Sequence, residues 1–252
     1  KDNGNNNNNN GGSSGNNSNM NPDQSDLLAS AAHTLYDSAG RLFETIRQSM
    51  RRCLALSNGK PFLLLVNEYR GSIQMYSESL ISKFPKVDYP PVTKALVNVG
   101  GSKAPPYKMP LEDEIVICRV ISTAEYCANV IPNLESQIKS KINIILEKEI
   151  NFSDQCDKFT DVIANAIDLL VKGIMSHTET VIKIIKKIKW DSLSSVDDES
   201  SYIPVIKTIL FDCIPRIRHA LTPIWFKNFC TKYATEFLDQ YLNVIMSQKR
   251  IC

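Results

Sequence analysis

The three histidines and seven cysteines are the residues whose side chains most readily bind metals or act as nucleophiles. His33, His177 and His219 lie far apart along the chain. None has a second ligand three or four residues away, which is the spacing that a metal site on a helix needs. The cysteines form no CxxC pair, and most stand among apolar residues at helical spacing: Cys53, Cys118, Cys127, Cys156, Cys213, Cys230 and Cys252. An odd, scattered set of this kind indicates reduced core thiols in the cytosol, so no metal and no cofactor is expected.

Acid–base chemistry has one candidate pair, Glu125 and Tyr126, within an apolar stretch of helical period. A carboxylate without a second titratable group nearby in sequence is a poor basis for general acid–base catalysis. A structural role for Glu125, in a helix-face or an inter-helix hydrogen bond, is therefore favoured. The sequence holds no GxGxxG, P-loop, GxSxG or HExxH motif, and Gly100-Gly101 is followed by prolines rather than by a helix start. We expect no catalytic residue, and the chain is predicted not to be an enzyme.

One basic cluster consists of Lys183, Lys186 and Lys187, with Lys189 close by. The first three fall on one face of a predicted helix, opposite a stripe of isoleucines. Contact with an anionic membrane surface or an acidic partner is one interpretation, worth about 1 kcal/mol per lysine beside a membrane. A solvated helix face is the favoured interpretation, because the chain as a whole is nearly neutral.

The elements that position these residues fall into two groups separated by a linker. Residues 1–24 form an Asn/Gly/Ser-rich tail, which we predict to be disordered because it has too little apolar surface to bury. A helical hairpin is predicted over residues 25–84, with Ser25 or Asp26 as its first cap and its turn at Asn58-Gly59. Residues 85–110 contain six prolines, so we predict a long exposed linker there.

A helical bundle is predicted over residues 111–252, truncated at its C-terminal end. Its first helix runs from Leu111 through Ile145 and is expected to kink at Pro132. Ser153 is predicted to cap the next helix, and Thr222-Pro223 to start the last one. The last helix carries six aromatic residues that are predicted to lie in the core rather than in an exposed groove: Trp225, Phe226, Phe229, Tyr233, Phe237 and Tyr241. Six long amphipathic helices without an alternating strand pattern predict an all-α, elongated bundle.

The overall charge and hydropathy exclude some classes of partner. With 29 basic and 27 acidic residues, the formal net charge is +2, which gives no electrostatic reason to expect nucleic acid. The sequence opens without a secretory signal, and we expect no stretch long and apolar enough to cross a membrane. A cytosolic protein that binds other proteins is therefore predicted.

A family resemblance rests on the string Ser122-Thr123-Ala124-Glu125-Tyr126-Cys127. Further matching patterns follow in order at plausible spacing, among them residues 134–142, residues 157–170, residues 215–218 and residues 229–234. The chain resembles the vacuolar protein sorting-associated protein 53 family over roughly residues 38–248, with the tail and the linker as insertions.

That resemblance implies a subunit of the Golgi-associated retrograde protein complex and of its endosomal recycling relative. The fold it implies is a set of elongated tandem helical bundles of the multisubunit-tether (CATCHR-like) type. The implied partners are sister subunits, SNARE proteins and small GTPases, and the implied location is peripheral on trans-Golgi network and endosome membranes. The family is not known for enzymes. A helical scaffold or adaptor outside the tether family is the alternative, although we see no internal repeat of the kind a solenoid would need.

Overall fold

The structure is a computed structural model that describes residues 35–86, 109–188, 190 and 199–248. Six α-helices and one 3-10 helix make up its regular structure: α2 (Asp37–Leu54), α3 (Lys60–Ile81), α5 (Leu111–Lys139), η1 (Ile144–Glu149), α6 (Ser153–Lys187), α7 (Ile203–Ala220) and α8 (Pro223–Met246). The described ranges contain no strand, so the all-α prediction is confirmed. The predictions for the tail, for Ser25 and Asp26, and for residues 87–108 of the linker lie outside the described residues.

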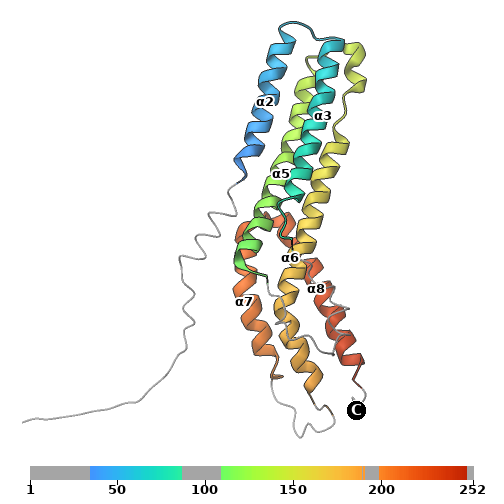
Figure 1. Cartoon of the computed structure of the whole chain (residues 1–252). Coiled ribbons are helices and arrows are strands. Elements are labelled where there is room, and N and C mark those ends of the chain that lie inside the picture. Colours follow the sequence, from blue (N-terminus) through green and yellow to red (C-terminus); the bar gives the residue numbers. More distant parts are fainter. Residues whose placement is uncertain (1–34, 87–108, 189, 191–198, 249–252) are drawn as a thin grey trace, which may run out of the picture.

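The helices form an elongated bundle around α6 (Figure 1). With 35 residues, α6 is about 50 Å long at 1.5 Å per residue. It contacts α3 and α5 along one half and α7 and α8 along the other. The hairpin α2–α3 and η1 lie at one end of the molecule, whereas the end of α8 lies at the other.

A single core cluster contains buried residues from all six α-helices, for example Phe43 of α2, Phe62 of α3 and Phe229 of α8. The hairpin therefore shares one core with α5 and α6, although residues 85–110 separate them in sequence. A second, smaller cluster lies toward the far end of α6, where Val181 and Ile185 pack with Tyr202 and Val244. The two core clusters follow each other along α6, which is why the bundle is elongated.

The helix boundaries follow the local sequence with two exceptions. As predicted, α3 begins after Gly59 with Pro61 in its first turn, and Thr222 occupies the N-cap position of α8. Helix α5 runs through Pro132 without a break, and the kink expected there stays a prediction. However, α5 ends at Lys139, so the predicted extension through Ile145 is wrong, and Ile145 is 80% exposed. Ser153 is the first residue of α6 rather than its cap, and its backbone N–H donates to Asn151 Oδ1 at 2.8 Å.

Helix α5 contradicts the expectation that no stretch is apolar enough to cross a membrane. By length and composition alone, Leu111–Lys139 qualifies as a membrane span. Many of its apolar side chains are instead buried within the bundle, including Ile117, Val120 and Ile121 at 0% exposure. Residues of this type also form the core helix of a bundle, and α5 packs in that way against α6.

Candidate functional site

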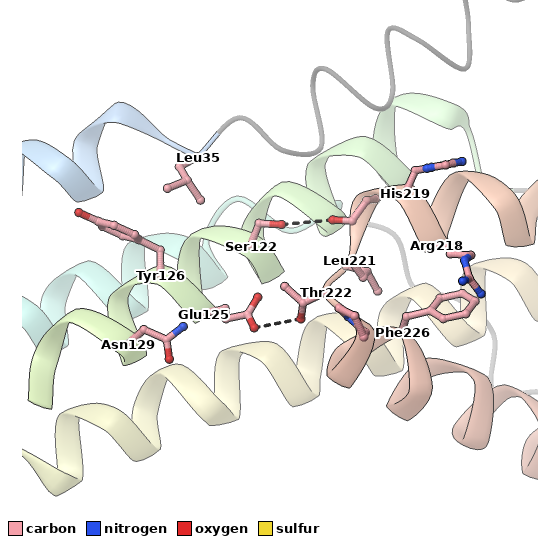
Figure 2. Close-up of a pocket in the computed structure, with 12 residues that line it drawn as sticks. Leu35, Ser122, Glu125, Tyr126, Asn129, Arg218, His219, Leu221, Thr222 and Phe226 are labelled. Atoms are coloured by element: carbon pink, nitrogen blue, oxygen red, sulfur yellow. Dashed lines mark hydrogen bonds between the residues drawn. The ribbon is translucent and has the colours of Figure 1, made fainter.

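The family string occupies the middle of α5, where it faces two other parts of the fold. Thr123, Ala124 and Cys127 are buried, whereas Ser122 and Glu125 are half-buried and face the turn between α7 and α8 (Figure 2). This division follows from helix geometry, because residues three and four apart share a face. The string thus connects α5 to the start of α2 on one side and to the α7–α8 turn on the other.

Thr123 fixes the start of α2. Its hydroxyl accepts a hydrogen bond from the backbone N–H of Tyr36 at 3.1 Å and donates to the carbonyl of Arg119 at 2.8 Å. The Tyr36 ring lies between two cations, with Arg119 at 4.6 Å and Lys83 at 4.7 Å from its centroid. Burial raises the pKa of the Tyr36 hydroxyl, and the Arg119 charge partly offsets this.

Tyr126 and Cys127 extend the same contact toward the hairpin. The Tyr126 ring meets the ring of Phe43 edge-on, with centroids 6.2 Å apart at an interplanar angle of 75°, which is a favoured aromatic geometry. Burial raises the pKa of the Cys127 thiol to about 12. At neutral pH the thiol is therefore protonated and acts as a small core residue rather than as a nucleophile.

The other face of the string holds the α7–α8 turn through two hydrogen bonds. Ser122 Oγ donates to the carbonyl of Ala220 at 3.4 Å, and Thr222 Oγ1 donates to Glu125 Oε1 at 2.9 Å. Thr222 therefore takes the N-cap position of α8 without making a side-chain cap hydrogen bond. Of the two hydrogen-bonding roles predicted for Glu125, the structure shows the one that links α5 to another element. Its partner was missed, because 97 residues separate the two in sequence.

A pocket of about 840 Å³ lies between this face of α5 and the α7–α8 turn. Among the side chains that line it are Glu125, Asn129, His219 and Phe226 (Figure 2). Arg218 stacks over the Phe226 ring at 5.7 Å from its centroid. The hydrogen bonds beside the pocket connect α5 to the turn between α7 and α8.

A buried ion pair joins the first turn of α5 to α7. Arg216 donates from Nε and Nη2 to the two carboxylate oxygens of Glu114, each at 3.2 Å, and its Nη1 lies 2.7 Å from Asp212 Oδ1. Burial raises the pKa of Glu114, and the Arg216 charge opposes that shift. Burial also disfavours the charge of Arg216, but its contacts with Glu114 and Asp212 raise its pKa overall. The sequence analysis did not identify a partner for Glu114, so this pair was missed.

The three predicted surface lysines all lie on the exposed face of the last turns of α6. Lys183, Lys186 and Lys187 are exposed, whereas Ile182 and Ile185 between them are buried in the second core cluster. The predicted opposition of lysines and isoleucines is therefore present. The structure does not bring these lysines together with the family string, which lies near the middle of α5.

The described residues contain no group of three or more His, Cys, Asp or Glu side chains arranged to hold a metal ion. Six cysteines fall in the described ranges, and all six are free thiols: Cys53, Cys118, Cys127, Cys156, Cys213 and Cys230. Of the histidines, His219 lines the pocket on the α7–α8 side. His177 lies on α6, and His33 is outside the described residues.

Comparisons with known proteins identify two relatives with related names. The chain is 27% identical over 226 residues to "Vacuolar protein sorting-associated protein 53 A" of Arabidopsis thaliana, which covers 90% of this chain and 27% of that protein. It is 22% identical over 142 residues to the "Vacuolar protein sorting-associated protein 53 homolog" of Caenorhabditis elegans, covering 56% of this chain and 17% of that protein. No family model and no solved structure matches. The chain thus spans about a quarter or less of the length of these relatives, and the predicted family resemblance is confirmed.

Proposed function

Since this chain is a homologue of the vacuolar protein sorting-associated protein 53 proteins, we propose that it is a non-enzymatic segment of a vesicle-tethering subunit. The observation that carries the proposal is a similarity extending along nine-tenths of the chain. The process is retrograde transport from endosomes to the trans-Golgi network. The subunit belongs to the Golgi-associated retrograde protein complex and its endosomal recycling relative, peripheral on the membranes of both compartments.

The architecture suits a part that holds binding surfaces at a distance. Two core clusters follow each other along α6, and side-chain contacts in the first turn and in the middle of α5 hold it to neighbouring helices. The Glu114–Arg216 pair joins α5 to α7, and Thr123 joins α5 to the start of α2. Contacts of this kind between helices keep the two ends of the bundle at a constant separation. A tether needs a constant separation if it is to position a vesicle relative to its target membrane.

The contact pattern argues against a solenoid scaffold. In a solenoid each helical unit touches only its neighbours along the chain. Here α6 contacts α3 and α8 as well as α5 and α7. One long central helix with others arranged around it is a bundle, so the described part of the chain favours the tether over a repeat-built adaptor.

Sister subunits of the complex are the first expected partners, followed by SNARE proteins and small GTPases. The test is affinity capture of the tagged full-length protein from its own cells, followed by mass spectrometry. We expect the other subunits of the tethering complex at near-equal amounts. A tagged helical protein of similar size serves as the control. Recovery of no sister subunit above that control would sink the proposal.

A further inference from the structure

Three large aliphatic side chains are exposed together at the end of the bundle formed by the α2–α3 turn and η1. Leu56 is 90% exposed in the turn between α2 and α3, and Ile144 and Ile145 are 77% and 80% exposed at the start of η1. The two segments are joined by a hydrogen bond from the backbone N–H of Asn143 to the carbonyl of Asn58, at 3.0 Å. Figure 1 shows both at the end of the rod opposite the C-terminus.

The backbone around these side chains is fixed, so their exposure is built into the fold. Ile142 and Ile150, on either side of η1, are 6% and 2% exposed. Asn143 Oδ1 accepts the backbone N–H of Ile145 at 3.0 Å and caps η1. After η1, Arg70 Nε donates to the carbonyl of Asn151 at 3.0 Å. Burial of the flanking isoleucines therefore holds Ile144 and Ile145 outward.

The segments that carry the aliphatic side chains are rich in basic residues, and two of these, Arg51 and Lys141, line a hollow together with Leu56. Five exposed basic residues lie on the elements that meet here: Arg51, Arg52, Lys60, Lys141 and Lys148. None of them forms an ion pair with a carboxylate of the described residues. The acidic residues of the same segments are Glu147 and Glu149. A chain with near-equal numbers of acids and bases thus places an excess of unpaired bases at one end.

We propose that this basic tip, made of Leu56, Ile144, Ile145 and the five cations, contacts an anionic membrane surface. The aliphatic side chains enter the boundary between headgroups and acyl chains, and the cations lie among the lipid phosphates. Stable attachment at a membrane takes two signals, and the tip supplies both an apolar and an electrostatic one.

A membrane fits this tip better than a partner helix does. An amphipathic helix binds in an apolar groove, whereas these side chains project from two separate turns. The hollow beside Leu56, about 660 Å³, is lined by Arg51, Ser57, Asn58 and Lys141 along with Leu54 and Ala55. Its rim is therefore polar and basic, which suits phosphate oxygens. The Lys183, Lys186 and Lys187 face has no comparable exposed aliphatic residue among its neighbours on α6.

The test is co-flotation of the full chain with phosphatidylcholine vesicles that contain or lack phosphatidylserine. It includes no sister subunit, so its result is independent of the proposed tether function. We expect flotation only with phosphatidylserine, weakening as salt is added. The combined substitution Leu56→Ser, Ile144→Ser and Ile145→Ser should lower the partition coefficient about tenfold per side chain removed. Replacing Arg51, Lys60 and Lys141 by Gln should lower it about fivefold per charge.

Matched controls come from the rest of the surface. Leu238, Leu242 and Met246 of α8 are also exposed, and replacing them by Ser should leave flotation unchanged. The same holds for replacing Lys183, Lys186 and Lys187 by Gln. Thermal unfolding of every variant checks that it is folded. Wild-type protein that does not float with anionic vesicles, or a tip variant that floats like wild type, would overturn the proposal. If the tip variant also lost a protein partner in affinity capture, the tip would be a protein-binding surface instead.

Discussion

Thr123 illustrates how one hydroxyl in the family string holds two elements together. It is 0% exposed, and it is the hydrogen-bond acceptor for the Tyr36 backbone N–H. Thr123→Val keeps the shape and removes that acceptor, so we expect a loss of about 1–3 kcal/mol in the free energy of unfolding. Denaturant titration measures this loss.

Thr178→Val is the matched control for that substitution. Thr178 is also 0% exposed, but its hydroxyl donates only to Met175 within its own helix. No backbone N–H loses its partner there, so the substitution should cost clearly less. Equal losses for the two variants would show that the Thr123–Tyr36 contact contributes nothing.

The Glu114–Arg216 pair predicts that replacing Arg216 lowers the free energy of unfolding by an amount that depends on pH. Arg216→Met leaves a buried carboxylate without its partner, which costs about 3–5 kcal/mol. Burial already raises the pKa of Glu114, and removing Arg216 removes the charge that lowers it. A folded-state pKa above the unfolded value means that ionisation works against folding as pH rises through the folded pKa. The loss in the free energy of unfolding caused by Arg216→Met should therefore be smallest in acid and grow toward neutral pH.

Unfolding of the variant and of wild type across that pH range measures the difference. The double variant Arg216→Met with Glu114→Gln carries no titrating group at position 114, so its defect should vary much less with pH. A defect in Arg216→Met that is the same in acid and at neutral pH would contradict the assignment.

Three cysteines should be unreactive in the folded protein. Cys118, Cys127 and Cys213 are buried, and burial raises the pKa of each, to about 12 for Cys127 and Cys213. Because the thiolate is the reactive form, iodoacetamide should modify these three only after denaturation. Peptide mass spectrometry with and without denaturant reads this out. Modification of Cys127 as fast as that of the half-buried Cys53 in the native protein would disprove the packing around the family string.

At the scale of single residues, the sequence identified the string but not its partners. Local spacing could place Glu125 on a helix and favour a hydrogen bond for it. It could not identify Thr222 as the partner. That contact depends on how α7 packs in the folded bundle, because Thr222 lies just after the end of α7. The Glu114–Arg216 pair was missed for the same reason, since 102 residues separate its members.

Gly173 lies inside α6, in a position where the side chain of Met109 packs close to its backbone. A Cβ on Gly173 would collide with the side chain of Met109, which is 5% exposed and whose N–H donates to Ser176 Oγ at 3.3 Å. Gly173→Ala should therefore stabilise the protein less than alanine does at an unobstructed helix position, because moving the Met109 side chain offsets part or all of the roughly 1 kcal/mol that alanine gains in a helix.

Gly71 in α3 provides the control, because a Cβ there would meet nothing within 4 Å. Gly71→Ala should raise the melting temperature through helix propensity alone, and by more than Gly173→Ala does. An equal rise in both variants would mean that Met109 does not pack on α6.

At the scale of elements, the sequence predicted the helices better than their ends. Apolar periodicity identified all six, and Gly59-Lys60-Pro61 and Thr222-Pro223 fixed two starts, because caps and prolines act locally. The end of α5 was misplaced, because Ile142, Ile144 and Ile145 continue an apolar run. The structure buries Ile142 and exposes the two others, and only the packing of the α2–α3 turn against this segment decides between those outcomes.

On the scale of the whole molecule, the all-α architecture followed from composition and periodicity, whereas the arrangement around α6 did not. Amphipathic stripes indicate that each helix has a buried face, but not which helix covers it. Only the structure shows that α6 packs against four other helices, α3, α5, α7 and α8. The bundle also holds the basic tip at one end, away from the lysine face of α6, which lies toward the other end.

The central claim, that this chain works as part of a vesicle tether, is tested most directly by removing it. Rapid depletion of the full-length protein, followed by electron microscopy, measures how many free vesicles lie around the trans-Golgi network. We predict that untethered vesicles accumulate there within the time of depletion, and that the wild-type protein restores their normal number. An unchanged vesicle number after complete depletion would contradict it.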